Sequence, residues 1–338
     1  MHMRPALLFS LARVAPLAGA LLLVQACSQV TPVATVADTT AAATGWTLIP
    51  AGTTNLNAVS GLSDTAVWVV GDQGTIGYWN GTQLAFETSG TTVTLRGVWA
   101  LDAGHVYAVG DGGTILARQG GGVWQSVGMN ATQQVLTAVW ADSTRVVAVG
   151  SAGTIVLGGM AGYKLLVNPD TENLFGVTGT PGGQVVAVGA LGLYAQINGT
   201  TVSRVAIPSF TKLLSGAASG GTAAFLVGQQ GTVYSASASG LTPIVGCPQT
   251  ALRAVTTTGS GPDVWAAGWD GTICKITGAT TTSFPYADAR WFNGIYAASP
   301  TSLWVVGASG TLMHGLPVTR VIDGGAAGAA DGAGLGGG

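Results

Sequence analysis

Aromatic and charged side chains that suit a binding surface gather between residues 269 and 291. Trp269 and Asp270 occupy a short Gly-x-x-Gly turn, and the run YADARW follows at residues 286–291. Tryptophan and arginine are the residues that most often anchor protein interfaces. A tryptophan at the tip of a two-residue turn also has few ways to be buried. We therefore predict a binding site built from Trp269, Asp270, Arg290 and Trp291, the alternative being that Trp269 packs back on its own strands.

A second set of residues has the types that glycoside hydrolysis requires. Arg96 and Arg253 hold equivalent second positions in two repeated strand-like runs, and Glu172 lies in a loop that leads into a third. Resemblance to the sialidases would imply an arginine cluster for the substrate carboxylate, an acid and a tyrosine activated by Glu, but no third arginine holds such a position in the repeats. Glu87, the remaining glutamate, falls on an outer run, and no motif places two carboxylates across the roughly 5–10 Å that glycoside cleavage requires. We expect Arg96, Arg253 and Glu172 to contribute to binding, with hydrolysis the least favoured alternative.

Other chemistry has little support in the sequence. His105 and His314 are the histidines beyond the N-terminal leader, and neither has a neighbour at metal-ligand spacing. No phosphate-binding loop, dinucleotide fingerprint or nucleophile elbow is present. The formal net charge is −2, with 12 Lys and Arg in 338 residues, which argues against a nucleic-acid partner. We predict no catalysis, metal or cofactor, and expect the turn acids Asp72, Asp111 and Asp270 to be solvated, with calcium binding a minor alternative.

These residues are positioned by a repeat. The pattern V-G-x-x-G-T-I, or a close variant, occurs seven times at steps of 39 or 40 residues. Its first glycines are Gly71, Gly110, Gly150, Gly189, Gly228, Gly268 and Gly307, and its second glycines are Gly74, Gly113, Gly153, Gly192, Gly231, Gly271 and Gly310. A β-rich period of this length is typical of a propeller or a solenoid.

Each repeat divides into four short strand-like runs separated by glycine-containing turns. In the second repeat these runs are Leu95–Ala100, His105–Val109, Thr114–Arg118 and Val123–Val127. Gly-x-x-Gly suits a two-residue hairpin loop, because glycine tolerates positive φ. A closed ring protects strand edges that a solenoid would expose. The sequence therefore predicts an all-β fold, a seven-bladed β-propeller of four-stranded antiparallel blades over residues 46–322.

Three positional regularities support ring closure. The third residue of each first run is small, which lets inner strands approach one another: Ala58, Gly97, Ala138, Gly176, Gly216, Ala254 and Gly294. The residue three before each first glycine is bulky or β-branched and should fill the space between blades: Trp68, Tyr107, Val147, Val186, Phe225, Trp265 and Trp304. Thr opens six of the seven third runs, with Leu193 as the exception.

The seventh blade needs an outer strand, and two segments compete for this place. Trp46–Ile49 resembles the fourth run of a repeat and precedes the first blade, whereas Leu316–Ile322 follows the last one. Because strands alternate in direction, the Gly-x-x-Gly turns and the blade-to-blade connections should emerge on one face of the disc. Trp269, Asp270, Arg290 and Trp291 are predicted to share that face.

The run Val106–Leu116 (VYAVGDGGTIL) resembles the repeat of the photosystem II assembly factor family and of the broader BNR-like bacterial propellers. The resemblance extends over all seven repeats. Members usually end the blade with a D-G-G-x-T-W Asp-box, whereas residues 120–124 here read GGGVW and lack the Asp. The resemblance implies a secreted scaffold or assembly factor that binds protein without catalysis. A glycan-binding propeller is the alternative, since tryptophan also stacks on sugars.

The N-terminal segment has the layout of a secretory signal: Arg4 and Arg13 precede an apolar stretch that is too short to cross a bilayer. Residues 23–27 (LVQAC) resemble the bacterial lipobox, although Gln25 stands where a small residue is usual. The resemblance implies a signal peptide over 1–26, a lipidated Cys27 and, with Ser28 next, anchoring in the outer membrane. An ordinary signal peptide is the alternative. Residues 27–45 are predicted to form a flexible tether, and the Gly/Ala-rich tail 323–338 to be disordered.

Two further cysteines, Cys247 and Cys274, lie in adjoining repeats. An exported protein meets an oxidising compartment, where a disulfide between them is allowed. Two unpaired, buried cysteines are the alternative. The partners expected for the chain are an envelope or cell-surface protein, or else a polysaccharide.

Overall fold

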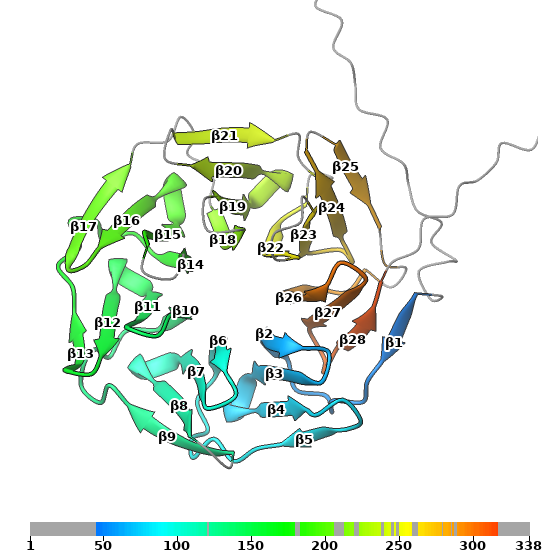
Figure 1. Cartoon of the computed structure of the whole chain (residues 1–338), viewed down its shortest axis with the longest axis horizontal. Helices are drawn as coiled ribbons and strands as arrows, with labels where there is room; N and C mark the ends of the chain where they lie inside the picture. The colour runs from blue at the N-terminus through cyan, green and yellow to red at the C-terminus, as the bar shows by residue number, and fades with distance from the viewer. Residues whose placement is uncertain are drawn as a thin grey trace, which may run out of the picture. The chain divides into compact units, whose positions relative to one another are not determined.

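A computed structural model describes residues 45–119, 122–179, 183–205, 213–219, 223–237, 240–244, 247, 250–258, 263–278, 280–284, 286 and 289–316. The predicted signal peptide 1–26, Cys27, the predicted tether up to residue 44 and the predicted disordered tail 323–338 lie outside these residues. The described residues form seven four-stranded antiparallel sheets. Figure 1 shows them as seven blades around a central axis, which confirms the predicted seven-bladed β-propeller.

The strands are ordered from the axis outward in every blade. The inner strands are β2 (Leu56–Ser63), β6 (Leu95–Asp102), β10 (Leu136–Ala141), β14 (Leu174–Gly179), β18 (Leu213–Ser219), β22 (Leu252–Thr257) and β26 (Phe292–Ser299). The second strands are β3 (Ala66–Gly71), β7 (His105–Gly110), β11 (Val146–Gly150), β15 (Val185–Gly189), β19 (Ala223–Gly228), β23 (Asp263–Gly268) and β27 (Ser302–Gly307).

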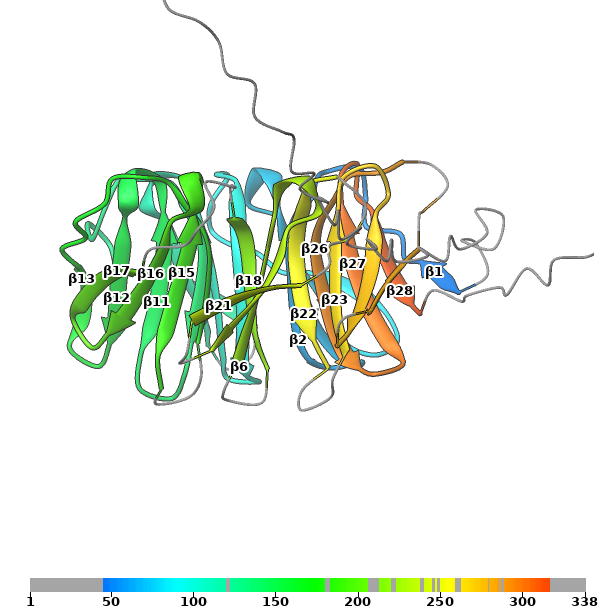
Figure 2. The same ribbon diagram turned by 90° about the horizontal axis from the view of Figure 1, so that it is seen from above.

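The two outer positions complete each blade. The third strands are β4 (Ile76–Trp79), β8 (Ile115–Gln119), β12 (Ile155–Gly159), β16 (Tyr194–Asn198), β20 (Val233–Ser237), β24 (Ile273–Thr277) and β28 (Leu312–Gly315). The outermost strands are β5 (Leu84–Phe86), β9 (Val123–Val127), β13 (Gly162–Leu165), β17 (Thr201–Val205), β21 (Gly240–Ile244), β25 (Thr280–Ser283) and β1 (Trp46–Leu48). Figure 2 shows the disc from its edge, with strands running between its two faces.

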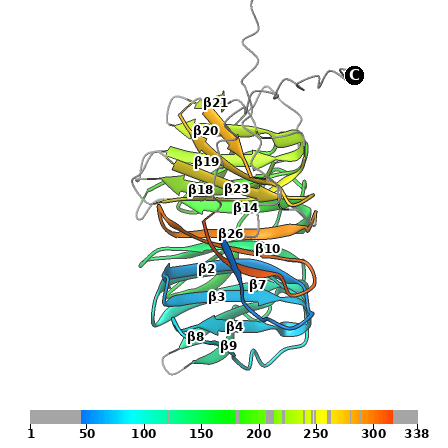
Figure 3. The same cartoon turned by 90° about the vertical axis from the view of Figure 1, so that its right-hand side faces the viewer.

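The N-terminal strand closes the ring. β1 pairs antiparallel with β28, with Trp46 opposite Gly315, so the first of the two predicted segments is the closing strand. Figure 3 shows blade 1 and blade 7 meeting at this point. Between them, the Asn293 side chain donates a hydrogen bond to the Leu56 carbonyl at 3.0 Å, and the Trp79 ring packs against Trp304. Ring closure therefore combines strand pairing with side-chain contacts.

The bulky residues before each first glycine fill the space between blades, as predicted. Trp68 packs with Leu95 and Val98 of the next blade, and Trp265 packs with Phe292 and Ile295. These apolar clusters lie between neighbouring sheets, so the core is a ring of blade interfaces in place of one central cluster.

Small residues at the third position of the inner strands let the strands converge. A Cβ added to Gly97 would lie 3.0 Å from the Ala138 Cα of the next blade. One assignment was wrong: Leu213 pairs with Gly228 and Ser215 with Val227, so Ser215 and not Gly216 is the third residue in blade 5. Two consecutive leucines, 213 and 214, precede it, and apolarity alone does not distinguish which of them begins the strand.

The Gly-x-x-Gly segments form single turns, five of them assigned as 3-10 turns: η2 (Asp72–Gly74), η3 (Asp111–Gly113), η4 (Ser151–Gly153), η5 (Ala190–Gly192) and η6 (Gln229–Gly231). The second glycine has positive φ, +69° at Gly74. The first glycine differs from the prediction, because Gly71 is extended, with φ −160°. It is required by close approach: a Cβ there would lie 2.1 Å from the Asn55 carbonyl oxygen.

Candidate binding face

One face of the disc carries both the Gly-x-x-Gly turns and the blade-to-blade connections, and we call it the turn face. Hydrogen bonds tie each turn to the start of an inner strand: Asp72 N donates to Asn55 O, and Trp269 N to Ala251 O, both at 3.0 Å. The residues that follow each inner-strand start therefore lie at the turn-face mouth of the central channel. The sequence-predicted residues Arg96, Arg253, Trp269, Arg290 and Trp291 all belong to this face.

The channel is a cavity of about 530 Å³ lined by the inner strands. Arg96 and Arg253 line it together with Asn57, Thr137 and Asn293, all at the second position of an inner strand. Glu172 is not among the lining residues; it lies partly buried in the connection before β14. The structure thus brings the two arginines to one channel and leaves the glutamate outside it.

Most polar residues at this ring position have a partner within the protein. Asn57 donates to Asp72 Oδ1 at 2.9 Å and to the Leu95 carbonyl of the next blade at 2.9 Å. Thr137 donates to the Leu174 carbonyl at 2.7 Å. Arg96 forms an ion pair with the turn acid of its own blade, Asp111, with Nη2 3.1 Å from Oδ2. Two turn acids therefore serve as partners for channel residues.

Arg253 differs from these residues. Among the residues that the structure describes, it has no hydrogen bond or ion pair, although its side chain is exposed to the channel. Partial desolvation within the ring lowers the pKa of Arg253, and the positive charge of Arg96 lowers it further. The channel mouth therefore holds two guanidinium groups, of which Asp111 neutralises one.

Trp269 and Trp291 stack on each other at the turn face. Their ring centroids are 5.3 Å apart and their planes differ by 18°, and the two residues are 37% and 54% exposed. Trp269 belongs to the turn of blade 6, and Trp291 precedes the inner strand of blade 7, where its carbonyl accepts a hydrogen bond from Ala308 N at 3.0 Å. The backbone thus holds an exposed aromatic pair across two blades.

Arg290 and Asp270 flank this pair differently. The Arg290 guanidinium lies over the Tyr286 ring, 5.8 Å from its centroid, and its Nη1 is 3.3 Å from Thr311 Oγ1. The Arg290 carbonyl accepts a hydrogen bond from Gly271 N at 2.7 Å. Asp270 is the exposed second residue of the turn, with φ +53°. Arg290 is thereby held against the protein, whereas Asp270 faces solvent.

The turn face also exposes apolar side chains that sequence reasoning missed. Met129 and Val167 lie in blade-to-blade connections and Leu191 lies at the tip of η5; they are 76%, 89% and 55% exposed. The sequence could have placed these residues on the turn face, because connections and turns emerge on the same face as Trp269. These three side chains belong to blades 2 to 4 and lie on the same face as the Trp269–Trp291 stack of blades 6 and 7.

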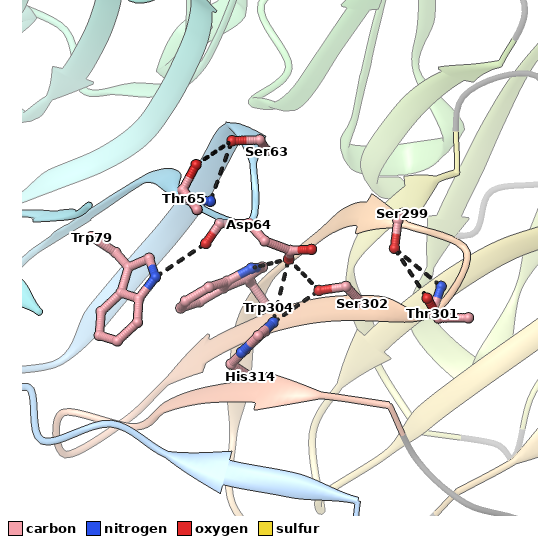
Figure 4. Close-up of polar contacts among 9 residues, drawn as sticks. All are labelled: Ser63, Asp64, Thr65, Trp79, Ser299, Thr301, Ser302, Trp304 and His314. Carbon is pink, nitrogen blue, oxygen red and sulfur yellow. Dashed lines mark hydrogen bonds and ion pairs between the residues drawn. The ribbon is translucent and has the colours of Figure 1, made fainter. Parts of the chain in front are cut away.

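A serine, a histidine and an aspartate meet where blade 1 joins blade 7 (Figure 4). His314 Nε2 lies 2.9 Å from Ser302 Oγ and 3.3 Å from Asp64 Oδ1, and Ser302 also bonds Asp64. In a hydrolytic triad the acid binds the ring nitrogen opposite the serine, whereas here both contact the same nitrogen. The His314 ring also stacks on Trp304 at 4.2 Å, so the cluster serves as a ring-closing contact.

The other glutamate, Glu87, is engaged at the interface between blades 1 and 2. It pairs with Arg118, with Nη2 2.8 Å from Oε1, and accepts a hydrogen bond from Trp124 Nε1 at 2.7 Å. The guanidinium of Arg118 lies over the Trp68 and Tyr78 rings. Glu87 is therefore a structural residue of the outer part of the propeller, as its sequence position predicted.

Cys247 and Cys274 are bonded to each other in the structure, with their Cα atoms 6.1 Å apart. Both are buried, in the apolar cluster with Val255 and Val264. Within the described ranges no group of three or more His, Cys, Asp or Glu residues could hold a metal ion. No helix in the same ranges is long and apolar enough to cross a membrane.

The sequence matches none of the protein-family models or curated proteins with which it was compared. The fold is similar to that of several solved structures. YCF48 bound to a D1 peptide is 16% identical with a TM-score of 0.63, covering 80% of this chain and 95% of that one. A catalytically inactive virginiamycin B lyase from Staphylococcus aureus with quinupristin is 12% identical with a TM-score of 0.71, covering 80% and 99%.

The WD40 propeller domain of Doa1 is also similar, at 12% identity and a TM-score of 0.64, with 79% of this chain and 94% of that domain covered. At these identities the comparisons show the fold alone.

Proposed function

We propose that this chain is a non-catalytic lipoprotein of the cell envelope whose propeller binds another protein, as a scaffold or assembly factor. The observation that carries the proposal is the exposed Trp269–Trp291 stack on a face that also exposes Met129, Val167 and Leu191. Exposed aromatic side chains are the residues that protein interfaces most often use as anchors. The partner is an envelope or cell-surface protein.

Two proteins of the same fold support a binding role: YCF48 has been solved with a D1 peptide, and Doa1 contains a WD40 propeller. The lack of a triad geometry at Asp64, Ser302 and His314, and the engagement of Glu87 by Arg118, favour binding over hydrolysis. The lipobox-like sequence before Cys27 supports a lipid anchor in the outer membrane.

The test uses the full chain expressed in its envelope and extracted in detergent. Trp269→Ala/Trp291→Ala is compared with Val123→Ala/Met160→Ala, which removes two exposed apolar side chains from the ends of outer strands away from the turn face. We expect one stoichiometric protein partner to be retained by the control and lost by the tryptophan variant. Retention of the partner by both variants contradicts the assignment of the turn face.

Anchoring is tested separately. Cys27→Ser should abolish incorporation of labelled palmitate and release the protein from the membrane fraction. If the variant stays membrane-bound and the wild type takes up no label, the anchor proposal is wrong, but the binding proposal is unaffected.

The second candidate function is glycan binding, which the same stacked indoles favour, because an exposed indole face can pack against a sugar ring. Polysaccharide retention that is lost on Trp269→Ala, without any protein partner, supports this candidate. A sialidase-like glycoside hydrolase is the third candidate, and turnover abolished by Glu172→Gln would support it.

A further inference from the structure

The repeat is broken at the channel mouth of blade 6. Register makes Arg253 the equivalent of Arg96, since each follows the leucine that pairs with the first glycine of the turn. The next residue after that glycine is Asp111 in blade 2 but Trp269 in blade 6. The position that supplies a counter-ion to Arg96 in blade 2 therefore holds an indole in blade 6, where Arg253 is the equivalent arginine.

Because blade 6 has Trp269 where blade 2 has Asp111, the Arg253 guanidinium and the Trp269 indole are both available to a ligand. Arg253 has no hydrogen-bond or ion-pair partner in the described ranges, whereas Asn57, Arg96, Thr137 and Asn293 all have one. Trp269 turns to Trp291 and leaves more than a third of its own surface exposed. A partly desolvated cation without a counter-ion is stabilised by an incoming anion.

We propose that Arg253 and the Trp269–Trp291 stack form a receptor for a carboxylate that adjoins a flat apolar side chain, presented by an extended acidic segment of the protein partner. This inference rests on the proposed function and specifies the chemistry of its partner. In blade 2 the residues at the equivalent positions, Arg96 and Asp111, are in direct contact. We therefore expect the carboxylate and the ring to come from neighbouring residues of the ligand.

The observations favour a peptide over other anions. The same face also exposes Met129, Val167 and Leu191 in the connections and turn of blades 2 to 4, and these side chains offer apolar contacts to a partner segment that crosses the channel mouth. Asp111 already neutralises Arg96, so one guanidinium remains for the ligand. A single carboxylate matches this charge, whereas a phosphate-rich polymer requires several cations.

The probe is a pair of blocked hexapeptides with glycines around a central Phe-Glu or Phe-Gln, titrated into the purified full chain and followed by calorimetry and tryptophan fluorescence. We expect Phe-Glu to bind at least about tenfold more tightly than Phe-Gln, since a charge-assisted hydrogen bond is stronger than a neutral one. Arg253→Gln should remove this preference, and Arg253→Lys should restore part of it. Arg204→Gln, which removes an arginine paired with Asp170, is the matched control.

A second variant tests the blade comparison directly. Trp269→Asp reproduces the arrangement of Arg96 and Asp111 in blade 6, so it should abolish binding of Phe-Glu without loss of thermal stability. Equal affinity for both peptides, or an unchanged preference in Arg253→Gln, overturns the inference. Binding of an oligoglucuronate in place of either peptide overturns it in favour of a glycan.

The two proposals fail in different ways. If the natural partner is lost in Trp269→Ala/Trp291→Ala but bound with full affinity by Arg253→Gln, the turn face is the binding face and the carboxylate receptor is wrong. If the tryptophan variant retains the partner, the proposed function itself is wrong.

Discussion

At the scale of single residues, six of the ten tryptophans form two groups with contrasting surroundings. Trp68, Trp140, Trp265 and Trp304 are buried between blades, whereas Trp269 and Trp291 are exposed and touch each other. The buried group determines stability and the exposed pair is available for binding. Substitutions in the buried group should therefore lower stability, whereas substitutions in the exposed pair should weaken binding with little effect on stability.

Trp304→Ala should lower the free energy of unfolding by about 3–5 kcal/mol, because it removes a fully buried side chain from the junction of blades 7 and 1. Trp269→Ala should cost about 1 kcal/mol or less, since the side chain is exposed. Chemical unfolding of both variants checks the comparison. A large loss of stability in Trp269→Ala would show that the stack is a structural element.

The ion pair of Asp263 with Lys275 should make the free energy of unfolding depend on pH. Desolvation raises the pKa of Asp263, but hydrogen bonds from Lys275 and Thr277 and the charge of Lys275 outweigh it, so the pKa lies below the usual 3.8. The stabilisation is therefore complete above pH 3.8 and is lost as the pH falls through the lower folded-state pKa. Asp263→Asn should cost about 1–2 kcal/mol at pH 7 and little at about pH 2. Urea unfolding of the wild type and the variant at both pH values tests this prediction. An equal loss of unfolding free energy at both pH values contradicts a role for the Asp263 charge.

At the residue scale, the sequence indicated which residues gather at the turn face, because turns and connections follow from strand order. It did not indicate the stack, which depends on how the connection between blades 6 and 7 brings Trp291 back to the turn of blade 6. The missing counter-ion of Arg253 is visible in the aligned repeats, but its meaning requires the contact between Arg96 and Asp111.

At the scale of the elements, the turn Gly110–Thr114 offers a matched pair of substitutions. Gly110→Ala should cost several kcal/mol, on the order of an overpacked core site, since its Cβ would lie 2.2 Å from the Thr94 carbonyl oxygen. Gly112→Ala should cost about 1 kcal/mol: its φ is +64° with open space around it. Other blades hold Gln73, Ala152 or Leu191 at this position with similar φ. Comparable melting temperatures for the two variants contradict this account.

The closing strand gives a second prediction at this scale. Deleting residues 1–48 removes β1 and leaves the edge of β28 unpaired, so the protein should lose cooperativity on melting and aggregate. Deleting residues 323–338 is the control and should leave the melting temperature unchanged. Equal stability of both deletions would show that β1 is dispensable for ring closure.

Blade number and strand order were predictable from the sequence because the period and the glycine pairs repeat throughout the chain. The choice of closing strand was not, since Trp46–Ile49 and Leu316–Ile322 are both apolar and both adjoin blade 7 or blade 1. The register of β18 was missed for a related reason: consecutive leucines leave its phase undetermined.

At the scale of the whole molecule, the N-terminal strand enters the propeller on the side opposite the turn face. Trp46 pairs with Gly315, the end of β28 that is far from the Gly-x-x-Gly turn, and the Gly45 carbonyl accepts a hydrogen bond from Leu316 N at 3.0 Å. The N-terminal segment therefore joins the propeller away from the turn face.

The most direct test of the central claim is photo-crosslinking from defined positions in the envelope. A photoreactive residue is placed at Gln230, an exposed position at the tip of η6 on the turn face, or at Met160, an exposed position in the β12–β13 turn on the opposite face. We predict one protein adduct from Gln230, absent from Met160 and abolished by Trp269→Ala/Trp291→Ala. An adduct that forms from Met160, or that survives the tryptophan substitutions, contradicts the assignment of the turn face as the binding surface.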